Sequence, residues 1–259
     1  MSYTIIKNDG SCGICGYIWQ VLRAMWHNPN SSYYIDFTQR CQYKDDTITK
    51  TSNVWGYYFK QPHSDDYPAS SEIVSVIDRI IDVPESEFRD VFMVNPTKED
   101  IAARRHEYFN IIKKYIRLQP HVENKITNFV ENNFKGKKVL GVHFRGTDHP
   151  DKKEITEYLQ VIKNKAALYD IIFCASDEYS RYNMLKVVFG DKVVTYDSIK
   201  SDDDKPLHYK ESISKYKIGE DVIVEAFLLS KTNFIFCCGN SNVNYLSRAI
   251  NPTLESQVL

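Results

Sequence analysis

Three side chains able to bind a charged group follow one apolar run: His143, Arg145 and Asp148 come directly after VLGV. Alternation in an extended segment puts His143 and Arg145 on the same face. The planar guanidinium of Arg145 can donate two parallel hydrogen bonds to a diphosphate, and Asp148 can hold that guanidinium from the following loop. A purely structural ion pair between Arg145 and Asp148 needs the same residues, so the triplet alone leaves both interpretations open.

Polar residues also follow two other apolar runs. Asp177 and Glu178 come after IIFCAS, and the run Asn240, Ser241 and Asn242 separates NFIFCC from the helical pattern VNYLSRAI. Free backbone N–H groups and the helix dipole make a helix start a good phosphate site. Small polar residues are also ordinary helix caps, so both a ligand site and simple capping fit these patterns.

Strands and helices alternate regularly after Gly136. The strand patterns are KKVLGVHF, DIIFCAS, KVVTYD and NFIFCCG, and the helical patterns between and after them include ITEYLQVIKNKAALY, EYSRYNMLKVVF, EDVIVEAFLLS and NVNYLSRAI. Apolar strands in such a succession are typical of a parallel sheet covered by helices on both faces. Ligands bind at the carboxyl ends of these strands, where all three polar groups are expected. We therefore predict a doubly wound parallel sheet over residues 135–259.

The first half of the chain predicts a second α/β unit, over residues 1–134. A β-branched run at residues 3–6 leads through a glycine-containing loop to the helical pattern YIWQVLRAMW and a second strand, SSYYIDF. We also expect a short aromatic strand at residues 55–59. Helical spacing extends from SSEIVSVIDRIID to about residue 134, with Pro120 separating two helices. The fold class is thus α/β, with two α/β domains facing each other.

The composition excludes several classes of partner and location. The chain has 33 basic and 34 acidic residues and a formal net charge of -1, so no overall field would attract nucleic acid or an anionic membrane. No apolar run approaches the ~20 residues of a membrane span, and the start MSYTIIKNDG lacks a signal-peptide pattern. We expect a soluble, cytoplasmic protein. Cys12 and Cys15 have metal-site spacing but no second pair to complete a site, so no metal is expected.

Three motifs together resemble a known family. GVHFRGTDH, FCASDE and GEDVIVEAFLLSKTNFIFCCGNSNVNYLSRAI resemble, in order and spacing, the motifs of the fucosyltransferase superfamily. The α1,6-fucosyltransferases of the nodulation and core-fucosylation types are more similar than the protein O-fucosyltransferases. The resemblance covers residues 137–250 and is loose over the N-terminal half. It implies a GT-B-like fold of two Rossmann-like domains, an acceptor-side domain at 1–134 and a nucleotide-sugar-binding domain at 135–259.

The resemblance also implies an activity and roles for individual residues. Such enzymes transfer fucose from GDP-fucose to a glycan hydroxyl, invert the anomeric centre and need no metal ion. Arg145 then binds the β-phosphate, His143 lies beside the nucleoside, and Ser241 contacts a phosphate. Asp177 and Glu178 lie near the donor, as do Asp148, Asn240 and Asn242. Glu225 aligns with a carboxylate that recognises guanine, whose N1–H and N2–H₂ edge uracil lacks; an exposed helical glutamate is the alternative.

The general base and the acceptor are less determined. Asp151 and Glu154 follow the first motif and rank equally as bases, and Asp9, in the N-terminal glycine loop, is a third candidate. The α1,6 type has a second arginine and a lysine where this chain has Gly146 and His149, so linkage is not inherited. Another donor, such as UDP-xylose, and a non-catalytic nucleotide- or glycan-binding protein remain alternatives.

Overall fold

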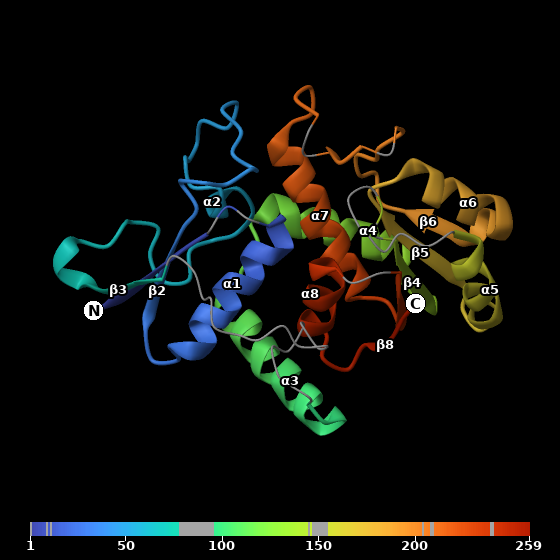
Figure 1. Cartoon of the computed structure of the whole chain (residues 1–259), viewed down its shortest axis with the longest axis horizontal. Helices are drawn as coiled ribbons and strands as arrows, with labels where there is room; N and C mark the ends of the chain where they lie inside the picture. Colours follow the sequence, from blue (N-terminus) through green and yellow to red (C-terminus); the bar gives the residue numbers. More distant parts are fainter. Residues whose placement is uncertain are drawn as a thin grey trace. The chain divides into compact units, whose positions relative to one another are not determined.

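The computed structural model describes residues 2–8, 10, 12–77, 96–144, 146, 155–203, 205–207, 210–238 and 241–259. Contacts divide the chain into two compact units, Met1–Glu123 and Asn124–Leu259 (Figure 1). This division falls inside helix α4 (Pro120–Asn133), whereas the sequence suggests a boundary after residue 134. Each unit contains a parallel sheet of its own, which confirms the expected α/β class.

The first unit is built on a three-stranded parallel sheet in the order β2-β1-β3. Strand β1 (Tyr3–Lys7), helix α1 (Ile14–His27) and strand β2 (Ser32–Asp36) form the predicted βαβ succession. Helix α3 (Lys98–Tyr115) packs against α1. Helix α4 begins at the proline that was expected to separate two helices.

Two predicted elements of the first unit are wrong in type. Residues 73–77 were expected to be helical but form strand β3 (Ile73–Ile77), preceded by the 3₁₀ turn η1 (Ser70–Glu72). The run IVSVI is rich in β-branched residues and pairs with β1, so sheet formation prevails over the helical spacing.

The second correction concerns the expected aromatic strand, which is the short helix α2 (Trp55–Tyr58). The Trp55 ring stacks on that of Phe59 with centroids 4.4 Å apart, a contact that the four-residue spacing of one helical turn allows. No strand is needed beside β2, because two buried amide side chains bond its edge. Asn53 accepts from Phe37 N at 2.9 Å, and Gln61 accepts from Ile35 N at 2.9 Å.

The second unit contains a five-stranded sheet in the order β6-β5-β4-β7-β8, parallel throughout. Its strands are β4 (Val139–Phe144), β5 (Ile171–Ser176), β6 (Val193–Thr195), β7 (Phe234–Cys238) and β8 (Glu255–Val258). Its helices are α5 (Ile155–Ala166), α6 (Tyr179–Phe189), α7 (Lys215–Leu229) and α8 (Asn242–Ile250), with the 3₁₀ turn η2 (Gly190–Lys192). The predicted doubly wound sheet is confirmed, with the edge strand β8 as an addition.

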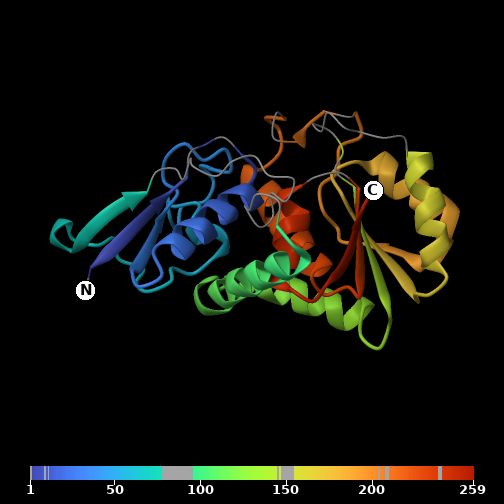
Figure 2. The same ribbon diagram turned by 60° about the horizontal axis from the view of Figure 1, so that its bottom comes forward.

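Helices cover both faces of this sheet (Figures 1 and 2). On one face, Leu140, Val142 and Phe144 belong to a buried cluster with side chains of α5 and α6. On the other face lie α4, α7 and α8. There Phe129 of α4 meets Phe173 of β5 edge to face, with ring centroids 5.5 Å apart. The end of helix α7 and the turn after it approach β4 closely at Gly141, where an added Cβ would lie 3.3 Å from Leu229 Cδ2 and 2.9 Å from Thr232 Oγ1.

Candidate functional site

The strand order of the second unit reverses direction at β4, and a doubly wound sheet is expected to have its ligand crevice at the end of such a strand. From β4 the chain moves outward to β5 and β6, then returns to form β7 on the opposite side of β4. The register aligns Phe144 with Ser176 on one side and with Cys238 on the other, so the three strands end at the same level. Ligands of doubly wound sheets bind at such a reversal point, and the three predicted polar groups follow these three strands.

Six of the predicted site residues lie outside the described residues. They are Asp9, Arg145, Asp148, Asp151, Glu154 and Asn240. His143, Asp177, Glu178, Glu225, Ser241 and Asn242 are described, and all six belong to the second unit. The geometry of the site is therefore built from these six residues and the groups around them.

His143 is the last but one residue of β4 and is only 5% exposed. It lies in register between Ala175 of β5 and Cys237 of β7. Alternation puts it on the same face as Gly141, the face that α7 covers, because Val142 and Phe144 point into the opposite cluster. The imidazole therefore lies under the crevice, on the α7 side of the sheet.

Gly146 joins the loop after β4 to the loop after β5. Its backbone N–H donates to Asp177 Oδ1 at 3.1 Å. A Cβ added at Gly146 would lie 2.5 Å from two carbons of the Glu178 side chain and 2.7 Å from Asp177 Oδ1. Only glycine fits this contact, so the absence of a second arginine after Arg145 has a packing cause.

Glu178 is fully buried and pairs with Arg181, whose Nε lies 2.9 Å from Glu178 Oε2. The backbone N–H of Glu178 donates to Ser176 Oγ at 3.1 Å, a short-range bond that is usual in turns. A buried carboxylate with an internal cation partner is held in place rather than presented to solvent. The structure thus gives Glu178 a supporting position behind Asp177 and Gly146.

Glu225 on α7 is buried, which excludes the alternative of an exposed helical glutamate. Ser198 Oγ donates to Glu225 Oε1 at 2.6 Å, and Lys200 Nζ donates in turn to Ser198 Oγ at 2.7 Å. Burial raises the pKa of Glu225 to about 7, while Lys200 and the Ser198 hydrogen bond act in the opposite direction. Its charge therefore changes near neutral pH.

Residues that the sequence analysis did not single out complete this part of the site. Asp221, one helical turn before Glu225, accepts from Ile199 N at 3.0 Å and pairs with Lys217. Burial also raises the pKa of Asp221. The two carboxylates fix the segment after β6 through Ile199 and Ser198. In the sequence, the four-residue spacing of Asp221 and Glu225 indicates that the two carboxylates lie next to each other on one helix face.

Ser241 is the N-cap of α8, and its side chain accepts from Val243 N at 3.3 Å. It is 8% exposed, while Asn242, the first residue of the helix, is exposed. The capping interpretation is therefore confirmed for Ser241. The same helix start lies at the carboxyl end of β7, where backbone N–H groups favour an anion.

The comparisons with known proteins concern the fold. No protein-family model matches the chain, and no curated protein matches it. Among solved structures, NodZ alpha-1,6-fucosyltransferase soaked with GDP-fucose aligns over 97% of this chain and 93% of its own, at 15% identity and a TM-score of 0.59. Fucosyltransferase NodZ from Bradyrhizobium aligns over 95% and 92%, at 14% identity and a TM-score of 0.57.

A plant protein gives a similar result. A mutant of Arabidopsis thaliana FUT1 in complex with GDP aligns over 100% of this chain and 71% of its own, at 9% identity and a TM-score of 0.62. The fold of the chain is thus fucosyltransferase-like, as the sequence resemblance implied. Within the described ranges, no helix is long and apolar enough to cross a membrane. The same part of the chain contains no group of three or more His, Cys, Asp or Glu residues arranged to hold a metal ion.

Proposed function

We propose that the protein is a glycosyltransferase that transfers fucose from GDP-fucose to a glycan hydroxyl. The observation that carries the proposal is the burial of Glu225 at the ligand end of a sheet whose fold is fucosyltransferase-like. Two of the similar structures contain GDP or GDP-fucose. A carboxylate is the group that best distinguishes guanine from uracil, because it can accept from both N1–H and N2–H₂.

The surroundings of Glu225 suit a residue that recognises the nucleobase of the donor. Ser198 occupies Oε1 and leaves the second carboxylate oxygen for a ligand, and Lys200 favours the ionised form. Because the pKa of Glu225 is about 7, hydrogen bonds from the N–H groups of a nucleobase need to lower it only slightly to ionise the carboxyl group fully at neutral pH. Asp177, whose Oδ1 accepts from Gly146 N, contributes slightly to the raised pKa of Glu225, which supports assigning both residues to the same proposed site.

The diphosphate would be bound on the β4 and β7 side of the crevice. Arg145 supplies the cation, and the α8 start at Ser241 supplies backbone donors. Negative charge grows on the departing diphosphate as the glycosidic bond of the donor breaks, and these groups would stabilise that charge without a metal ion. His143 would lie beneath the nucleoside.

The acceptor hydroxyl must lose a proton as it attacks the anomeric carbon from the opposite face, which inverts that centre. Asp151, Glu154 and Asp9 stay the candidate bases. In this proposal the two units form a GT-B-like pair, with the first unit holding the acceptor and the second holding the donor.

A nucleotide panel tests the proposal. We expect GDP and GDP-fucose to raise the melting temperature of the whole protein and UDP and UDP-xylose to leave it almost unchanged. A larger shift in melting temperature with UDP-xylose than with GDP-fucose would mean that the donor is a UDP-pentose. No shift with any nucleotide would favour a non-catalytic glycan-binding protein.

Two variants of Arg145 test its proposed role in binding the diphosphate. Arg145→Ala should abolish turnover of GDP-fucose, and Arg145→Lys should restore only a small part of it, because lysine keeps the charge but loses the planar fork. Lys163→Ala, on an exposed position of α5, is the control and should turn over the donor normally. Near-normal turnover by Arg145→Ala would refute the proposed role.

A further inference from the structure

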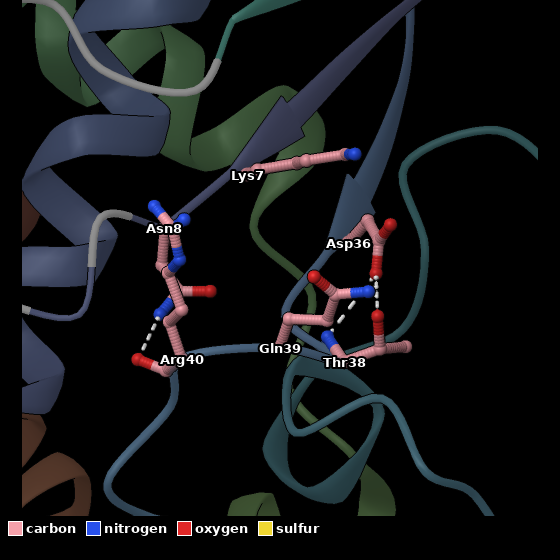
Figure 3. A pocket seen from close by; sticks show the side chains of 6 residues that line it. All are labelled: Lys7, Asn8, Asp36, Thr38, Gln39 and Arg40. Atoms are coloured by element: carbon pink, nitrogen blue, oxygen red, sulfur yellow. Dashed lines mark hydrogen bonds between the residues drawn. The ribbon is translucent and has the colours of Figure 1, made fainter.

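The first unit has a pocket of its own at the carboxyl ends of its strands. Lys7 and Asn8 end β1, and Asp36 ends β2. The following segment, Thr38 to Arg40, closes the pocket, which has a volume of about 210 Å³ (Figure 3). Every lining residue that the structure describes is polar or charged. Sites for drug-sized apolar ligands are mostly apolar and larger, roughly 300–1,000 Å³, so this pocket suits one small polar unit.

The backbone of Arg40 is held in an unusual conformation at this pocket. Its φ of 54° is the one positive φ of a non-glycine residue in the described part of the chain. Glycine or asparagine adopts this region at lower cost than arginine. The Arg40 carbonyl accepts from Asn8 Nδ2 at 2.9 Å, and a Cβ at Gly10 would lie 2.7 Å from the same oxygen. These contacts hold Arg40 in a backbone conformation that arginine adopts at a higher cost than glycine or asparagine.

The pocket has unbalanced charge. The side chains of Lys7 and Arg40 make no ion pair or hydrogen bond with other residues that the structure describes. Among the lining residues that the structure describes, the single carboxylate is that of Asp36, which is fixed by Thr38, whose N and Oγ1 donate to Asp36 Oδ1 at 3.1 and 2.6 Å. Figure 3 shows Asn8 and Arg40 on one side of the pocket and Asp36 and Gln39 on the other. The described lining residues thus include two cations and one carboxylate that is already hydrogen-bonded.

We infer that this pocket binds a monosaccharide unit that carries a carboxylate. Arg40 would take the carboxylate, since a guanidinium can bind it with two parallel hydrogen bonds. Lys7, whose ammonium Figure 3 shows on the side of Asp36, would donate to a ring hydroxyl. The second oxygen of Asp36 and the amide of Gln39 would bind ring hydroxyls, as both can accept from O–H and the amide can also donate. The claim that this sugar is part of the acceptor rests on the proposed function. The claim that the pocket binds the sugar does not.

Saturation-transfer NMR on the whole protein without nucleotide tests the inference. The probes are methyl β-glucuronoside, methyl β-glucoside and acetate. We expect the glucuronoside to receive strong saturation and the neutral glucoside to bind at least tenfold more weakly. Equal saturation of the two glycosides would overturn the inferred preference for a carboxylate. Saturation of acetate alone would show an anion site that does not recognise sugar.

Variants locate the binding. Arg40→Asn removes the guanidinium while tolerating the positive φ, and Lys7→Met removes the ammonium while keeping the alkyl chain. Arg40→Asn should weaken glucuronoside binding at least tenfold and Lys7→Met should weaken it less, whereas Lys60→Met, exposed in the same unit, should bind normally. Unchanged binding in Arg40→Asn, or equal loss in the control, would overturn the assignment. GDP binding, measured separately by melting temperature, tests the proposed function, so the two failures are distinguishable.

Discussion

Replacing Glu225 by glutamine tests the guanine site through a charge that the structure makes unusual. Glutamine has nearly the shape of glutamate and can still accept from Ser198 Oγ, which donates to Glu225 Oε1 at 2.6 Å. It lacks the second negative oxygen that would accept from guanine, and its amide nitrogen would instead face the guanine donors. The Glu225→Gln variant should therefore fold normally and lose its preference for GDP over UDP.

The magnitude follows from the pKa. Burial raises the pKa of Glu225 from 4.5 to about 7, and one pKa unit corresponds to about 1.4 kcal/mol. The folded state holds this proton more tightly than the unfolded state does. The free energy of unfolding of the wild type should therefore fall by about 3 kcal/mol, relative to Glu225→Gln, as pH rises from 4.5 to 7. Above the folded pKa the difference is constant.

Under the proposed function, in which the ionised Glu225 carboxylate binds guanine, the same titration should control the nucleotide preference. The ionised carboxylate binds guanine, and about a tenth of the sites are ionised one unit below the pKa, so GDP affinity at pH 6 should be about tenfold weaker than at pH 8. UDP has the same titrating diphosphate, so the ratio of GDP to UDP affinity isolates the contribution of Glu225.

Two measurements check this reasoning. Urea unfolding of both proteins at a series of pH values between 4.5 and 8 gives the stability difference, and calorimetric titration with GDP and UDP at pH 6 and 8 gives the affinity ratio. A stability difference that does not change with pH would mean that Glu225 is ionised throughout. A GDP preference that survives in Glu225→Gln would mean that another group reads the base.

Three further predictions concern the support of the site. Ser241→Ala and Ser214→Ala each remove an N-cap and should each cost about 1 kcal/mol of stability, but only Ser241→Ala should also weaken GDP binding; equal GDP affinity in both would leave Ser241 as a cap alone. Gly146→Ala should lower the free energy of unfolding by about 1–3 kcal/mol, because the new Cβ meets the buried Glu178 side chain, and an unchanged urea midpoint would contradict that packing. Arg181→Met should cost about 3–5 kcal/mol by leaving Glu178 buried without its cation, and adding Glu178→Gln should recover part of that loss; a double variant less stable than Arg181→Met would contradict the pairing.

The sequence predicted the second unit well because its strands are short apolar runs separated by helical patterns. The edge strand β8 was not predicted, since ESQV is polar and mostly exposed and pairs only on one side. In the first unit, IVSVI satisfies helical spacing and strand composition at once, and only its pairing with β1 decides between them. Local pattern does not contain that long-range pairing.

For the candidate site, too, the sequence indicates which residue types are present but not how deeply each side chain is buried. Its position could be predicted, because the carboxyl ends of parallel strands follow from the strand order. The burial of Glu225 could not, because it depends on the segment after β6, which brings Ser198 and Lys200 over α7. Neither residue has a local pattern that points to a helix turn many positions later in the chain.

Gly146 shows how one departure from a family pattern is tied to others. The space that a side chain at this position would need is occupied by Asp177 and Glu178, and Glu178 is fixed there by Arg181. Introducing the missing arginine would place its Cβ against a buried ion pair, so it would disturb the β5 loop before it reached a phosphate. In the proposed donor site, the diphosphate would therefore depend on one arginine after β4 and on neutral donors at the α8 start. A donor site with fewer cations leaves more of its discrimination to the base, which makes Glu225 the residue whose loss should most change donor choice.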